Sequence, residues 1–221
     1  MKSKLIIGVL VSGSGSNLQS IIDNIEANRL EAAIGIVISN AADAYALERA
    51  RKHGIETAVV DHRLYATRRA FEDVLIGTLR EASVELVVMA GFMRVLSDHF
   101  LEAFPMRVMN IHPALLPSFK GMDAQRQAFE YGVKFSGCTV HFADNGVDTG
   151  PIIIQSVVPL LPDDTLETLR NRILAEEHRL YPQAIQFFAE GRITVSGRTV
   201  HISNQRKPDS FPLRNPPLED F

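Results

Sequence analysis

The sequence predicts an α/β protein with a single Rossmann-like open sheet, mostly parallel, with helices on both faces and an antiparallel C-terminal portion. Apolar runs at residues 5–11, 33–39 and 86–90 alternate with stretches of helical periodicity. Runs that are apolar at nearly every position are typical of strands buried on both faces of a parallel sheet. Two later β-rich runs, 135–142 and 151–158, are separated only by a polar turn, which predicts an antiparallel hairpin.

The first half of the chain alternates strands and helices. The strand at 5–11 leads into a Gly-rich turn at 12–17, and apolar residues then recur at helical spacing from Leu18 to Ile25. The alternation continues with strands at 33–39, 56–60 and 86–90 and helices at 46–53 and 66–82. Right-handed connections between such elements give a parallel sheet.

The second half mixes short elements with one long helix. We expect Ser97 to cap a helix at 99–104, an apolar run at 107–109 to form a strand, and Gly132 to end a helix at 123–131. A long helix starts at 163–165, and Pro182 is expected to bend or break it before a final short helix that Gly191 ends. One domain should cover residues 1–202, followed by an irregular, Pro-rich tail at 203–221.

The amino-acid composition indicates which kinds of protein, partner and cellular location are compatible with this chain. The 221 residues are 46% hydrophobic and 22% charged, which is ordinary for a globular protein. A net charge of -3 gives no reason to expect nucleic acid or an anionic membrane as a partner. The single cysteine, Cys138, excludes an internal disulfide and indicates a reducing, cytoplasmic location. The histidines show no metal-ligand spacing, so no metal is expected.

The Gly-rich turn at 12–17 is a candidate anion site. A strand, a glycine turn and a helix N-terminus present backbone N–H groups to a phosphate. Position 18 is Leu, so the third glycine of the dinucleotide fingerprint is missing, and no Gly-Lys-Ser/Thr sequence follows. The turn favours a monophosphate over a dinucleotide, with a simple structural turn as the alternative.

Asn110 and His112 form the candidate catalytic pair. They lie two residues apart near the end of a predicted strand, so their side chains leave the same face. Open α/β sheets keep their sites at the carboxyl ends of strands. An amide beside an imidazole suits a reaction that develops an oxyanion and moves a proton, whereas a lone histidine is more often structural.

Two further segments have open interpretations. Asp148 lies in a Gly-rich turn, where it is either a solvated loop carboxylate or a partner that orients His112 and raises the pKa of its imidazole. The segment 91–96 follows a buried strand and could contact a flat aromatic ligand, or it could be a loop that contributes to the core.

Together, these motifs resemble the folate-dependent formyltransferases. The resemblance rests on residues 12–17, 90–96, 110–117, 140–142 and 148–153, and extends from about residue 5 to residue 193. It is strongest to the members that act on glycinamide ribonucleotide in purine biosynthesis. It implies transfer of a formyl group from 10-formyltetrahydrofolate, as co-substrate, to the amine of that nucleotide, by a monomer or a homodimer.

The resemblance also implies roles for individual residues. Asn110, His112 and Asp148 would be catalytic. The substrate phosphate and ribose would be bound by Gly15, Ser16, Asn17 and Glu177. The folate would contact Arg68, Met93, Arg94, Val95, Leu96 and Asn110, with the 143–148 loop closing over the pterin. A cis peptide bond is expected before Pro117.

The chain departs from the family pattern at two places. Asp123 and Gln125 occupy a loop in which relatives often carry histidines, and Leu174 replaces a polar or basic residue near the phosphate. These substitutions put individual substrate contacts in doubt.

Several other functions are compatible with parts of the sequence. A formyltetrahydrofolate hydrolase or another folate-dependent formyltransferase would share Asn110, His112 and Asp148, although relatives that act on tRNA or hydrolyse the folate would need a further domain. A non-catalytic nucleotide-binding module would explain the Gly-rich turn but not those three residues together.

Overall fold

The computed structural model describes residues 4–205 and 214. Its strands are β1 (Leu5–Val11), β2 (Ala32–Ser39), β3 (Thr57–Val59), β4 (Leu86–Met89), β5 (Val108–His112), β6 (Phe135–Phe142), β7 (Ile152–Pro159), β8 (Ile193–Ser196) and β9 (Thr199–Ile202). Its helices are α1 (Ser16–Glu26), α2 (Tyr45–Lys52), α3 (Arg68–Glu81), α4 (Asp98–Ala103), α5 (Ala124–Tyr131) and α6 (Leu166–Ala189), with a 3₁₀ turn at His62–Leu64.

Within the described residues the strands form one nine-stranded sheet in the order β3-β2-β1-β4-β5-β6-β7-β9-β8. The pairs from β3 to β5 are parallel, and β6 then pairs antiparallel with both β5 and β7. The predicted fold class is therefore confirmed, including the antiparallel C-terminal portion. The hairpin expected at 135–142 and 151–158 is β6–β7.

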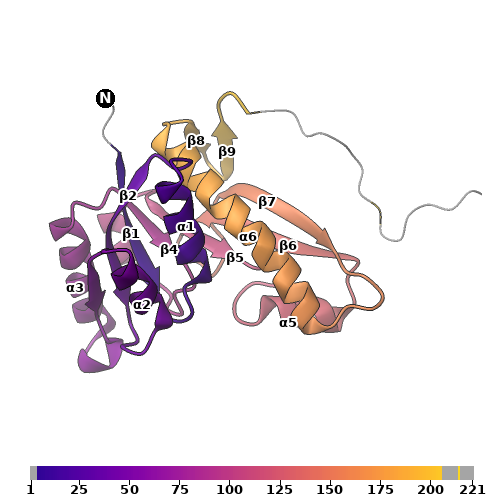
Figure 1. Ribbon diagram of the computed structural model, residues 1–221, viewed down its shortest axis with the longest axis horizontal. Helices are drawn as coiled ribbons and strands as arrows, with labels where there is room; N and C mark the ends of the chain where they lie inside the picture. Colours follow the sequence, from indigo (N-terminus) through magenta and orange to yellow (C-terminus); the bar gives the residue numbers. More distant parts are fainter. Residues whose placement is uncertain (1–3, 206–213, 215–221) are drawn as a thin grey trace, which may run out of the picture.

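The sheet has a hydrophobic core on each face. Along β1, Val9 and Val11 pack in one core with α1, α2 and α6, whereas Leu10 packs in the other core with α3 and α4. Successive side chains of a strand point to opposite faces, which explains why the run is apolar throughout. Figure 1 shows α6 crossing the sheet diagonally, so that one helix spans its parallel and antiparallel halves.

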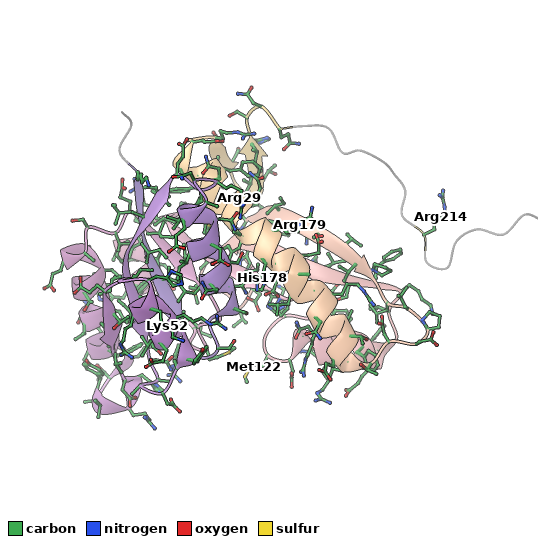
Figure 2. The ribbon with its side chains drawn as sticks, viewed as in Figure 1. Arg29, Lys52, Met122, His178, Arg179 and Arg214 are labelled. Carbon is green, nitrogen blue, oxygen red and sulfur yellow. The ribbon has the colours of Figure 1, made fainter. Side chains whose placement is uncertain are left out.

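Pro182 was expected to bend or break the long helix, and the break, with a separate short helix after it, is wrong, because α6 is unbroken from Leu166 to Ala189. A proline has no N–H to donate to the carbonyl four residues earlier. Here that carbonyl belongs to His178, and the Ser20 hydroxyl of α1 donates to it at 2.6 Å. The tertiary contact satisfies the acceptor that the proline leaves free, and Figure 2 shows His178 next to α1.

Other local predictions also differ from the structure. Ser97 precedes α4, but its side chain makes no cap hydrogen bond, and its hydroxyl instead points to Glu72, to which it donates. The hairpin of β8 and β9, which turns at Gly197 with a φ of 58°, was not expected. Residues 206–213 and 215–221 of the predicted tail lie outside the described residues, and the 1–202 domain boundary stays a prediction.

Candidate active site

Asn110 and His112 share one carboxylate at the end of β5. The Nδ2 of Asn110 donates to Asp148 Oδ1 at 3.3 Å, and His112 Nδ1 lies 3.3 Å from Asp148 Oδ2. Both side chains therefore leave the same face of the strand, as their spacing predicted. The contact between Asp148 and His112, which the sequence left open, is present.

Asp148 is fixed by its backbone as well as by its side chain. Its φ of 50° lies in the left-handed region, which turns the connection between β6 and β7 back toward β5. The backbone N–H of Gly121 donates to Asp148 Oδ2 at 2.8 Å. Burial opposes ionisation, but the neighbouring His141 and His112 side chains and the Gly121 hydrogen bond together outweigh it and hold the pKa of Asp148 below its ordinary value.

His112 is buried, and both of its ring nitrogens have partners. Its Nε2 lies 2.8 Å from the Phe119 carbonyl, which only accepts, so this nitrogen carries a hydrogen. Burial lowers the pKa of His112, while the Phe119 carbonyl and the Asp148 carboxylate act in the opposite direction. Asp148 acts to raise the pKa of His112, as the second interpretation expected, but desolvation is larger, so the pKa of His112 lies below its ordinary value.

His141 is a member of this cluster to which the sequence assigned no role. It lies directly opposite Asn110 in the antiparallel pairing of β5 with β6. Its Nε2 is 3.2 Å from Asn110 Nδ2 and 3.6 Å from Asp148 Oδ1, and its Nδ1 is 2.8 Å from the Phe142 carbonyl. A histidine inside a β-rich run was the available signal, but only the register of the strands shows what it faces.

The predicted phosphate turn has the backbone that an anion site needs. Gly15 precedes α1 with a φ of 71°, and no side chain caps the first turn of that helix, which begins at Ser16. A Cβ at Gly15 would lie 2.6 Å from the Cβ of Ala46, so glycine is required there. Arg49 of α2 donates to the Ser14 carbonyl at 2.9 Å and brings to the turn a positive charge that the sequence analysis missed.

Asn17 and Glu177, which are 160 positions apart in sequence, meet beside this turn. The Asn17 Nδ2 donates to Glu177 Oε2 at 2.7 Å, and both side chains are buried. Burial raises the pKa of Glu177, against the hydrogen bond from Asn17. The Asn17 Oδ1 is buried and has no hydrogen-bond partner among residues 4–205 and 214. The residues expected to bind the nucleotide thus form one group.

The predicted folate residues lie where β4 ends. Met93 and Val95 are 68% and 54% exposed, whereas Leu96 is buried in the core, so only part of this segment is open to a ligand. Arg94 lines a cavity of about 130 Å³ with Arg68 and Val95. The guanidinium of Arg68 donates to the Val95 carbonyl and, at 3.1 Å, to Glu72 Oε1.

Asp123 lies in the loop before α5, where the chain departs from the family pattern. Among the described residues, its side chain pairs with arginines and not with the catalytic group. It accepts from Arg170 of α6 at 3.0 Å. Met122, which is 84% exposed, extends from the loop toward the parallel half of the sheet (Figure 2). Gln125 and Leu174 are half-buried. The effect of these departures on substrate binding stays a prediction, whereas the peptide bond before Pro117 is cis as expected.

The described residues offer neither a metal site nor a membrane segment. Within them, no group of three or more His, Cys, Asp or Glu side chains is arranged to hold a metal ion. None of their helices is both long enough and apolar enough to cross a membrane.

Comparison with known proteins shows which family has these features. The model of the formyl transferase family matches residues 5–185. Phosphoribosylglycinamide formyltransferase of Escherichia coli K12 is 40% identical over 202 residues, which cover 91% of this chain and 95% of the relative. Glycinamide ribonucleotide transformylase 1 from Symbiobacterium toebii superposes with a TM-score of 0.89 at 53% identity, over 91% of this chain and 95% of that one.

A longer relative matches over one part of its length. The human trifunctional purine biosynthetic protein adenosine-3 is 45% identical over 194 residues, which cover 88% of this chain but only 19% of the human protein. The chain thus spans about a fifth of this trifunctional relative. It belongs to the formyl transferase family.

Proposed function

We propose that this chain is a phosphoribosylglycinamide formyltransferase, which transfers a formyl group from 10-formyltetrahydrofolate to the amine of glycinamide ribonucleotide. The observation that carries the proposal is the convergence of Asn110 and His112 on the Asp148 carboxylate at the end of β5. Relatives of the same length, at 40–53% identity, bear the name of this activity.

The residues suit an acyl transfer to an amine. The substrate nitrogen attacks the formyl carbon, and the formyl oxygen becomes an oxyanion in a tetrahedral intermediate. Amide and imidazolium N–H groups stabilise such a charge most strongly in a site that excludes water. Asn110 and protonated His112 supply these groups, and Asp148 holds both side chains in place. The proton lost by the amine passes to the leaving folate nitrogen, with Asp148 and a water molecule as the carriers.

The resting geometry sets a requirement on this mechanism. His112 Nε2 donates to the Phe119 carbonyl, and Nδ1 faces Asp148. For His112 to donate to the oxyanion, Nε2 has to exchange the Phe119 carbonyl for the substrate oxygen. Hydrogen bonds in a catalytic site often reach their productive arrangement only when substrate is bound.

The two substrates have separate binding regions in this proposal. The phosphate of the nucleotide binds Gly15, Ser16 and Asn17 at the start of α1, and Glu177 accepts from the ribose hydroxyls. The folate lies along Met93, Arg94, Val95 and Leu96 with Arg68 nearby. Asn110 lies on β5, the strand beside β4. In this proposal the formyl group and the amine meet at its side chain.

The test is the release of tetrahydrofolate by the purified protein with and without glycinamide ribonucleotide. We expect release only when the nucleotide is present, together with formation of the formylated nucleotide. Release without the nucleotide would support the formyltetrahydrofolate hydrolase instead. Binding of the nucleotide without any release would support the non-catalytic binding module.

A further inference from the structure

Glu72 is a buried carboxylate outside the catalytic group. It lies on α3 and is 1% exposed. Its Oε1 accepts from the backbone N–H of Ser97 at 2.8 Å and from Arg68 Nε at 3.1 Å, and its Oε2 accepts from the Ser97 hydroxyl. A buried carboxylate is costly unless its oxygens are hydrogen-bonded, and both oxygens of Glu72 are.

Each hydrogen-bond partner of Glu72 either belongs to the segment at residues 93–97 or donates to it. This segment is neither helix nor strand, so its polar groups need partners from elsewhere. Ser97 at its end is held by Glu72, and the carbonyl of Val95 accepts from Arg68, which Glu72 also holds. At its start, the Met93 N–H donates to the hydroxyl of Ser12 at 2.8 Å.

Packing of α3 against the core does not require a carboxylate at position 72, since an apolar side chain would pack there. The neighbours of Glu72 on the buried side of the helix, Phe71 and Leu75, belong to the core with α4. A carboxylate adds what an apolar side chain lacks, namely simultaneous acceptance from a guanidinium and from a backbone N–H. The side chain therefore fixes Arg68 and the 93–97 segment relative to each other.

We propose that Glu72 is a positioning residue for the folate co-substrate. It sets the spacing between the Arg68 guanidinium and the exposed side chains of Met93 and Val95, which together form the surface that the folate meets. The inference rests on the proposed function, because that function assigns these residues to the folate. It predicts that loss of Glu72 weakens folate binding while nucleotide binding and the chemical step are retained.

The test measures kinetics for both substrates in Glu72→Leu, Glu72→Gln and Asp73→Asn. In Glu72→Leu we expect the KM for 10-formyltetrahydrofolate to rise roughly tenfold or more, since hydrogen bonds to a charged group are lost. The KM for glycinamide ribonucleotide and the kcat at saturation should change by less than about twofold, as for a loss of uniform folate binding. Glu72→Gln should restore most of the affinity, because its oxygen still accepts from Arg68 and Ser97 and its amide donates to the Ser97 hydroxyl.

Asp73→Asn is the matched control. Asp73 is the next residue of α3, its side chain is 55% exposed, and it contacts His99 Nε2 of α4 at 2.6 Å. It also links α3 to α4, but it does not contact the 93–97 segment through any hydrogen bond that the structure shows. Its KM for the folate should stay at the wild-type value.

Two results would overturn the inference: an unchanged folate KM in Glu72→Leu, or an equal rise in the KM of both substrates, which indicates general loosening. If Glu72→Leu does not fold, Ser97→Ala replaces it. That variant should raise the folate KM selectively, and an unchanged value would overturn the inference.

Calorimetric binding of tetrahydrofolate to the same variants tests the role of Glu72 without turnover. If the wild-type protein binds tetrahydrofolate but lacks transferase activity, and Glu72→Leu loses that binding, the result counts against the proposed function and not against the role of Glu72.

Discussion

Replacement of Asp148 by Asn tests the centre of the proposed mechanism. The wild-type carboxylate accepts from Gly121 N–H at 2.8 Å and from Asn110 Nδ2 at 3.3 Å, and it faces His112 Nδ1 at 3.3 Å. An asparagine has one oxygen and one NH₂ group. Gly121 and His112 contact the same oxygen, Oδ2, so an amide oxygen in that position still faces both but no longer carries a charge. The NH₂ group then faces the donor Asn110, and that hydrogen bond is lost.

The size of the effect follows from those contacts. A hydrogen bond to a charged group contributes about 1.5–3 kcal/mol and one between neutral groups about 0.5–1.5 kcal/mol, so losing the Asn110 bond and weakening the His112 contact removes about 2–5 kcal/mol. Because about 1.4 kcal/mol is a factor of ten in rate, kcat should fall by roughly 10–10³. The Asn110 side chain is no longer held by residue 148, and His112 is held more weakly.

The pH dependence gives a second, independent readout. Burial lowers the pKa of His112, and the Asp148 charge is one of the influences that raise it. Without that charge the pKa of His112 falls further. If protonated His112 stabilises the oxyanion, activity is lost as pH rises through its pKa, so this limb should move to lower pH in Asp148→Asn.

The assay is initial-rate formation of tetrahydrofolate across pH with both substrates saturating. Asp144→Asn is a suitable comparison, because it removes the same charge from the same loop, and the Asp144 carboxylate accepts from Gly146 and Thr149 within that loop. Its pH profile should stay in the wild-type position. A kcat within about threefold of wild type, or an unmoved limb, in Asp148→Asn would refute this reasoning.

Four further substitutions test the site and the fold. Asn110→Ala and His112→Ala should each lower kcat on the order of 10²–10³ with unchanged thermal unfolding, and near-normal turnover would remove that residue from the mechanism. Asn17→Ala should raise the KM for glycinamide ribonucleotide more than that for the folate, because buried Glu177 loses its donor; an equal effect on both substrates would contradict the proposed nucleotide site. Ser20→Ala should lower the free energy of unfolding in urea by about 1–3 kcal/mol with activity retained, since the His178 carbonyl beside Pro182 is left without its donor; unchanged stability would show that the helix does not need this contact.

Much of the fold followed from periodicity. The uniformly apolar runs of β1 and β4 identified central strands, and the two β-rich runs identified the β6–β7 hairpin. The short β8–β9 hairpin was missed because its alternation covers only a few residues. Pro182 misled the prediction for a different reason, since the donor that replaces its N–H comes from Ser20, which is remote in sequence.

The candidate site also combines features that the sequence predicts with features that only the structure shows. The spacing of Asn110 and His112 predicted a shared face, because alternation along a strand is a local property. The sequence could not show that His141 lies opposite Asn110, since strand register depends on tertiary pairing. It also could not reveal that Ser97 bonds Glu72 instead of capping α4.

Residues that are close along the chain specify the type of fold, the strand end that carries Asn110 and His112, and the glycine turn before α1. Contacts between distant segments bring Asp148 to that pair and Asn17 to Glu177. Such contacts also set the direction of the pKa shift of His112. Asp148 acts to raise this pKa, as the sequence suggested, but desolvation depends on every group packed around the ring and outweighs that charge.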